Sequence, residues 1–132
     1  MQDVLSIKIP FYDVDPMNVV WHGNYVKYFE MARCSFLEKK NMTYADMERC
    51  GYAFPVASLK VKYIRPCVFG QEIQVQLKLK ECENFLVFQY KIVDKETKEK
   101  LCIGETKQMA VDLKNKKAVY EIPQIFLEQI KG

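Results

Sequence analysis

Residues 24–40 contain more apolar side chains than one face of a helix can hold. They are Tyr25, Val26, Tyr28, Phe29, Ala32, Phe36 and Leu37. Their three- and four-residue spacing predicts a helix whose apolar surface is much wider than a narrow seam. Because few polar side chains remain for the other sides, we expect the rest of the chain to enclose this helix on most of its circumference. Asn24 is its predicted N-cap and Asn41 its predicted end.

Several other segments alternate apolar and polar side chains, which is typical of half-buried β-strands. They are residues 5–12, 57–64, 72–80, 85–93 and 100–111. In the first of them the alternation places Phe11 on the same face as Leu5, and Pro10 indicates a sheet edge or a strand end. Short helices are predicted within residues 43–51 and 122–130.

The order of these elements is one strand, one long helix and then a run of strands. This order predicts an α+β domain, in which one antiparallel five-stranded sheet wraps around a single long central helix. Residues 1–132 contain no repeat and no linker, so we expect one domain. Such a sheet has open edges, and we therefore expect a homo-oligomer, either a dimer or a tetramer.

Charge and hydropathy argue against two classes of partner. The net charge of +3 is spread along the chain, whereas nucleic-acid binding proteins usually concentrate basic residues in one stripe. No apolar run approaches the roughly 20 residues that a membrane-spanning helix needs. The N-terminus lacks the basic and apolar pattern of a secretory leader, so we expect a cytoplasmic protein with reduced thiols.

The cysteines do not form a metal-binding pattern. They are Cys34, Cys50, Cys67, Cys82 and Cys102, with no C-x-x-C pair and only one histidine in the chain. A structural zinc site is therefore not expected. The stretch "DVDPMNVVWHGN" begins like a calcium loop, but it lacks the required glycine at the sixth position and the glutamate at the twelfth. We predict no metal.

The tract "FYDVDPMNVVWHGNY" places Asp13, Asp15 and His22 directly before the predicted helix. The aspartates could simply accept backbone hydrogen bonds in a turn that Pro16 stiffens. A nucleophilic triad is poorly supported, because His22 is the sole imidazole. A third interpretation explains more of the tract. The first N–H groups of a helix lack acceptors and can stabilise an oxyanion, and a neighbouring carboxylate can activate water or attack a carbonyl.

The tract, followed by "VKYFEMAR", resembles the hot-dog-fold acyl-CoA thioesterases of the 4-hydroxybenzoyl-CoA thioesterase family, and in particular the small bacterial members associated with the Tol–Pal system. "KVKYIRPCVFGQEIQV" resembles the second and third strands of that family. The resemblance implies the hot-dog fold and hydrolysis of a small or medium acyl-CoA, aliphatic or aromatic, to a free acid and CoA. It implies no cofactor, because CoA is part of the substrate, and an active site between subunits.

The resemblance also implies roles for individual residues. Asp15, the second aspartate of D-x-D, matches the catalytic position as general base or nucleophile. The backbone N–H of His22, helped by Gly23, matches the oxyanion donor, and the His22 imidazole can position substrate or water. Met17 and Asn18 stand where many relatives have small residues, so we expect them to influence the choice of acyl group. Asn18 can adopt the left-handed conformation that glycine would take.

Basic residues could hold the phosphates of CoA. Arg65 is the best candidate, and Lys60, Lys62, Lys78 and Lys80 are further ones unless they only form a solvated sheet face. Two other functions remain open. A hot-dog dehydratase acting on acyl-carrier-protein thioesters would use His22 as its base, and a non-catalytic protein would bind thioesters without turnover.

Overall fold

The computed structural model describes residues 1–132 and contains two antiparallel sheets. The five-stranded sheet has the order β1-β4-β5-β6-β3, and the three-stranded sheet has the order β2-β7-β8. The strands of the larger sheet are β1 (Gln2–Lys8), β3 (Val56–Tyr63), β4 (Glu72–Glu81), β5 (Leu86–Asp94) and β6 (Lys100–Gln108). Those of the smaller sheet are β2 (Tyr52–Ala53), β7 (Ala110–Asp112) and β8 (Lys117–Val119).

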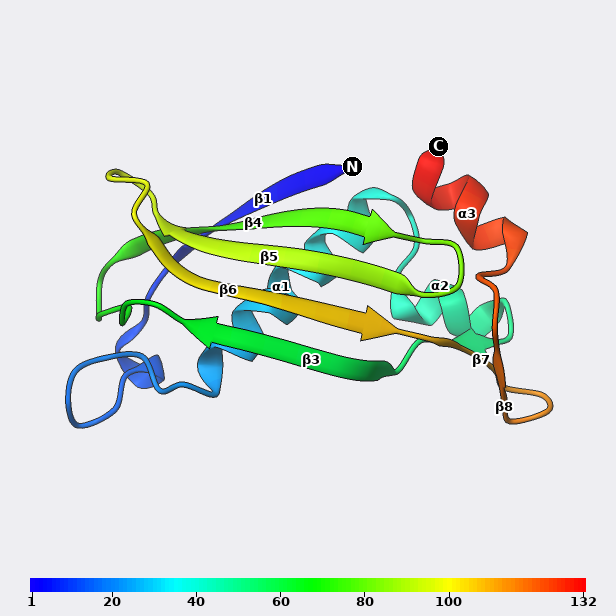
Figure 1. The fold of residues 1–132 in the computed structure, drawn as a ribbon, viewed down its shortest axis with the longest axis horizontal. Helices are drawn as coiled ribbons and strands as arrows, with labels where there is room; N and C mark the ends of the chain where they lie inside the picture. The colour runs from blue at the N-terminus through cyan, green and yellow to red at the C-terminus, as the bar shows by residue number, and fades with distance from the viewer.

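One long helix, α1 (Asn24–Lys39), lies across one face of the larger sheet, as Figure 1 shows. A short 3₁₀ turn (Phe11–Asp13) precedes it, and α2 (Tyr44–Arg49) and α3 (Gln124–Lys131) are the other helices. This arrangement confirms the predicted α+β architecture of a five-stranded antiparallel sheet around one long helix.

The core lies between α1 and the sheet. Ile73, Val75 and Leu77 of β4 are all buried, as their alternation predicts. The ring of Phe29 on α1 stacks on that of Tyr90 on β5, with ring centroids 4.6 Å apart. Gly104 on β6 lies beneath Phe29, and a Cβ at this position would collide with the Phe29 ring. The absence of a side chain therefore allows α1 to approach the sheet closely.

Two predicted strands end earlier than the alternation indicated. Pro10 ends the first, so Phe11 lies in the 3₁₀ turn with 70% of its surface exposed instead of in the core. The last predicted strand breaks at Met109, and its end forms β7 in the smaller sheet. Period-2 patterns do not report where a chain changes sheets, because both sides of the break can keep the same alternation.

The start of α1 also differs from the prediction. Gly23, not Asn24, is the N-cap residue, and the Asn24 side-chain amide instead donates to the carbonyl oxygen of Asp13 over 2.9 Å. The helix ends as predicted, since Asn41 has a φ of 53° that no helix can continue. Part of α1 stays uncovered, because Met31 and Cys34 are exposed. The enclosure of the helix is therefore less complete than its composition predicted.

A polar cluster interrupts the core beside α1. The Arg33 side chain is 3% exposed and donates to the hydroxyl oxygens of Tyr44 and Tyr90, over 2.8 and 3.2 Å. Tyr90 in turn hydrogen-bonds the hydroxyl of Thr106 over 2.7 Å. A buried guanidinium needs such partners, because an unpaired buried charge is costly. The cluster fixes the position of α1 along the sheet.

Candidate active site

The tract before α1 folds into a short antiparallel loop. Val14 and Val20 form a bridge, the Asp15 N–H donates to the Val19 carbonyl over 2.9 Å, and the Trp21 N–H donates to the Asp13 carbonyl over 3.1 Å. The Val20 N–H also donates to the carbonyl of Cys67 over 2.8 Å, in the connection between β3 and β4. The loop is therefore closed on itself and held to the connection between β3 and β4.

Asp15 sits at the turn of this loop. Its Oδ1 accepts the Met17 N–H over 2.8 Å, and its carbonyl accepts the Asn18 N–H over 2.8 Å. Asn18 adopts the left-handed conformation expected for it, with a φ of 64°. The Asx turn thus orients the Asp15 carboxylate through one oxygen. The other oxygen has no hydrogen-bond partner, and the side chain is only half-buried, so this oxygen can meet a substrate or a water molecule.

Asp13 has a different environment from Asp15. It is 4% exposed, and its carboxylate accepts hydrogen bonds from the Lys27 Nζ over 2.6 Å and from the Tyr28 hydroxyl over 2.7 Å. Burial, reinforced by the Asp13 carboxylate, raises the pKa of Tyr28, so the hydroxyl keeps the proton that it donates. Asp13 is therefore more than a turn residue: it connects the loop to α1, and both of its oxygens are occupied.

The N-terminus of α1 presents unpaired donors. The backbone N–H groups of His22 and Gly23 form no hydrogen bond within the chain. The His22 carbonyl accepts a hydrogen bond from the Tyr63 hydroxyl of β3 over 2.9 Å. Since C=O and N–H of a trans peptide point in opposite directions, Tyr63 fixes the direction of the Gly23 N–H. These free groups also carry the partial positive charge of a helix start.

Aromatic rings surround this helix start. The Trp21 ring lies over Gly23 so closely that a Cβ there would collide with it. The His22 ring is exposed and lies edge-to-face with that of Tyr63, with centroids 6.4 Å apart. A half-buried carboxylate, free N–H donors and apolar rings can together bind a carbonyl compound and attack its carbonyl carbon.

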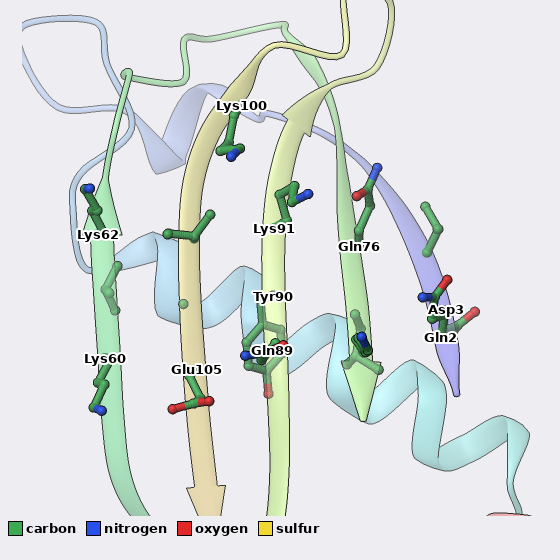
Figure 2. A pocket seen from close by; sticks show the side chains of 16 residues that line it. Gln2, Asp3, Lys60, Lys62, Gln76, Gln89, Tyr90, Lys91, Lys100 and Glu105 are labelled. Carbon is green, nitrogen blue, oxygen red and sulfur yellow. The ribbon is translucent and has the colours of Figure 1, made fainter. Parts of the chain in front are cut away.

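The other predicted site residues lie apart from one another. Met17 is 80% exposed at the tip of the loop. Arg65 follows β3 at the end of the sheet, where its Nε forms an ion pair with Glu99 over 2.6 Å. Lys60 and Lys62 project from the sheet face opposite α1 (Figure 2), and with Lys78 they line a cavity of about 950 Å³. Lys80 forms an ion pair with Glu105 over 3.3 Å.

Three contacts of the site were not predicted from the sequence. They are those of Lys27 and Tyr28 with Asp13, and that of Tyr63 with His22. Lys27 and Tyr28 lie beyond the loop, about one turn into α1. A single sequence offers no sign that they contact the Asp13 carboxylate. Tyr63 belongs to a strand that is distant in the sequence. The alternation of that strand predicted only which of its side chains share a face of the sheet.

The structure contains no group of three or more histidine, cysteine, aspartate or glutamate side chains arranged to hold a metal ion. None of its helices is long and apolar enough to cross a bilayer.

Comparisons with known proteins identify the family of the chain. The model of the thioesterase-like superfamily matches residues 9–130. A provisionally named esterase of Aquifex aeolicus is 30% identical over 125 residues, which are 94% of this chain and 94% of that protein. The acyl-CoA thioesterase YbgC of Helicobacter pylori is 30% identical over 83 residues, 63% of this chain and 60% of that protein. The crystal structure of a DHNA-CoA thioesterase from Staphylococcus aureus, 28% identical, superposes with a TM-score of 0.81 over 90% of this chain and 80% of that one.

Proposed function

The chain belongs to the thioesterase-like superfamily and is an acyl-CoA thioesterase of the hot-dog fold, and we propose that Asp15 and the start of α1 carry out the hydrolysis. One observation carries this proposal. The same loop contains a carboxylate with one oxygen free of hydrogen bonds and two backbone N–H groups that have no acceptor. The substrate is a small or medium acyl-CoA, aliphatic or aromatic.

In the proposed reaction the thioester carbonyl oxygen lies against the N–H groups of His22 and Gly23. Asp15, through its free oxygen, removes a proton from water as the water attacks the carbonyl carbon, or attacks that carbon itself. Either route places negative charge on the carbonyl oxygen, and the N–H groups stabilise it. The carbon–sulfur bond then breaks, and the CoA sulfur leaves as a thiolate that takes up a proton. In the second route, water hydrolyses the resulting anhydride with Asp15.

The Asp15→Asn variant tests this assignment with little disturbance of the loop. An asparagine Oδ1 can still accept the Met17 N–H, so the turn is retained while the carboxylate is lost. We expect kcat on an acyl-CoA panel to fall by roughly 10² or more. Turnover equal to that of the unchanged enzyme would remove Asp15 from the mechanism. A single turnover in ¹⁸O-labelled water tests for direct attack: acid product without ¹⁸O requires that Asp15 attacked the carbonyl and that water then opened the anhydride at the Asp15 carbonyl.

His22→Ala is the matched variant for the alternatives. It removes the imidazole but keeps the backbone N–H, so we expect a loss below about tenfold. A dehydratase that uses the imidazole as its base would lose far more activity in His22→Ala than in Asp15→Asn. A non-catalytic thioester-binding protein would turn over no member of the panel.

Other residues serve substrate binding in this proposal. Met17 and Asn18 lie at the tip of the loop, where they can contact the acyl group. Arg65 can exchange Glu99 for a phosphate of CoA, because both partners of this ion pair are exposed.

The proposed active unit is a dimer formed through β3, with a tetramer as its further assembly. β3 is an edge strand of the larger sheet. Leu59, Tyr63 and Ile64, on or directly after it, are 42–49% exposed although they are large and apolar. A second copy would pair this edge and cover these side chains. Light scattering of Leu59→Lys tests this assembly: a charge at a paired edge should give monomers, and an unchanged mass would exclude β3 as the interface.

A further inference from the structure

The sheet face opposite α1 carries a set of lysines that have no acidic partner. They are Lys60, Lys62, Lys78, Lys91 and Lys100, and they line the cavity of about 950 Å³ (Figure 2). None of these five forms an ion pair. Two acids also line this cavity, but Asp3 pairs with Lys39 and Glu105 pairs with Lys80. We call these five lysines and the residues between them the lysine face.

The strand register concentrates three of these charges around Ile103. Lys62 on β3 and Lys91 on β5 are both direct cross-strand neighbours of Ile103 on β6. Two strand spacings place their Cα atoms about 10 Å apart. Lys100 begins β6 and pairs with Val93, two residues after Lys91. Because no carboxylate pairs with these ammonium groups, together they give the face a positive potential that attracts an anion, most strongly at low salt.

The face also offers groups that suit a nucleotide. Gln76 and Gln89 supply amide donors and acceptors between the lysines. Val4 on β1 is 47% exposed and Ile103 on β6 is partly exposed, and each offers an apolar contact for a base on either side of Gln76 and Lys91. Amides, aliphatic side chains and unpaired ammonium groups together fit a phosphorylated nucleoside better than a bare ion.

The lysine face is connected to the candidate active site at the end of the sheet. Lys62 directly precedes Tyr63, the residue whose hydroxyl contacts the His22 carbonyl. The N–H groups of Ile64 and Arg65 both donate to the carbonyl of Leu101, over 2.9 and 3.0 Å, next to Lys100. A ligand that leaves the loop past Ile64 and Arg65 would therefore meet Lys62 and Lys100 first.

We propose that the lysine face binds the 3′-phosphorylated ADP part of the CoA substrate, with Lys62, Lys91 and Lys100 contacting its phosphates. This inference rests on the proposed function, because it assigns a place to the nucleotide of the same substrate. It assigns the lysines a role in binding and none in the chemical step.

The test compares two thioesters with the same acyl group: the acyl-CoA and the acyl-N-acetylcysteamine, which has no phosphate. The variant is Lys62→Gln/Lys91→Gln/Lys100→Gln. The control is Lys114→Gln/Lys117→Gln/Lys131→Gln, which removes the same charge from residues outside the cavity and without ion pairs. We expect the first variant to raise KM for the acyl-CoA at least tenfold, with kcat and both constants for the short thioester unchanged. The control should leave all of these constants unchanged.

Three results would overturn the proposal: an unchanged KM for the acyl-CoA, an equal rise for both thioesters, or the same rise in the control. Failure of the proposed function would give a different result, because the wild type would then hydrolyse neither thioester. Calorimetric titration with adenosine 3′,5′-bisphosphate tests the lysine face even if the protein hydrolyses neither thioester. Wild type and control should bind it, and the lysine variant should bind it at least tenfold more weakly. Absence of binding to the wild type would refute the site.

Discussion

The hydroxyl of Tyr63 donates a hydrogen bond to the carbonyl oxygen of His22 over 2.9 Å, and this contact joins an edge strand of the sheet to the residue directly before the N-cap of α1. The same His22 carbonyl also receives the Tyr25 N–H over a longer distance, 3.4 Å. The peptide between His22 and Gly23 is thereby held from one side, and its N–H remains free on the other. A hydrogen bond to the carbonyl also strengthens the N–H as a donor, because the two groups polarise each other.

Replacing Tyr63 by phenylalanine should lower kcat roughly tenfold and leave KM nearly unchanged, since the N–H matters most when the carbonyl oxygen becomes negative. Burial raises the pKa of Tyr63, so its hydroxyl remains a donor throughout the neutral pH range. Steady-state kinetics on one acyl-CoA measure both constants. Tyr12→Phe is the matched control, because Tyr12 is 73% exposed and its hydroxyl has no partner. A change in KM alone would contradict a role in orienting the oxyanion donor.

Replacing Asp13 by alanine should lower the free energy of unfolding by about 3 kcal/mol, because hydrogen bonds to a charged group contribute about 1.5–3 kcal/mol and a buried Tyr28 hydroxyl loses its acceptor. Urea denaturation measures the change. Asp3→Ala is the control, since the Asp3–Lys39 ion pair lies nearer the surface and should contribute less than about 1 kcal/mol. Equal decreases in the free energy of unfolding in the two variants would show that the buried contacts of Asp13 stabilise the protein no more than a surface ion pair does.

Replacing Gly23 by alanine should reduce kcat by roughly tenfold, because the new methyl group collides with the Trp21 ring and forces this ring away from its place over the helix start. The Gly23→Ala/Trp21→Ala double variant removes the collision, so it should regain activity relative to Gly23→Ala. Kinetic comparison of these variants with Trp21→Ala completes the cycle. If the double variant regains nothing, Gly23 matters for a reason other than its contact with Trp21.

Replacing Met17 by alanine should leave the free energy of unfolding within about 0.5 kcal/mol, because its side chain is 80% exposed. The ratio of kcat/KM between long and short acyl-CoAs should change by roughly threefold to tenfold, since one apolar contact to the acyl group is lost. Met31→Ala, at an exposed position of α1, should not change this ratio. An unchanged ratio in Met17→Ala would place the acyl group away from the loop tip.

Much of the fold could be predicted because it depends on regular patterns. The buried row of β4 follows from strict alternation, and the long apolar segment that became α1 indicated both a helix and a sheet to cover it. The end of α1 at Asn41 was likewise predicted correctly. The N-cap was not, because Asn24 uses its side chain to bind the loop at Asp13 instead of capping its own helix. Such a choice depends on a tertiary neighbour.

The candidate site, like the fold, could be predicted only in part. Its location before α1, and the family to which the chain belongs, could be predicted from "DVDPMNVVWHGNY", because loop and helix start are contiguous in the sequence. The roles proposed for Asp15, His22 and Gly23 remain predictions until the variants are measured. The contrast between Asp13 and Asp15 could not be predicted from two aspartates of equal chemistry. It arises because Tyr28 and Lys27 reach only Asp13.

The sequence by itself therefore determined the elements, the single apolar helix and the loop that precedes it, since these depend on neighbours along the chain. Only the tertiary structure decided which aspartate is buried, which tyrosine holds the helix start and which lysines share a face. Lys62 and Lys91 lie on β3 and β5, and only the strand order brings them to the two sides of Ile103, which shares β6 with Lys100. Hydrogen bonds between strands fix that order, and single-sequence periodicity carries no information about it.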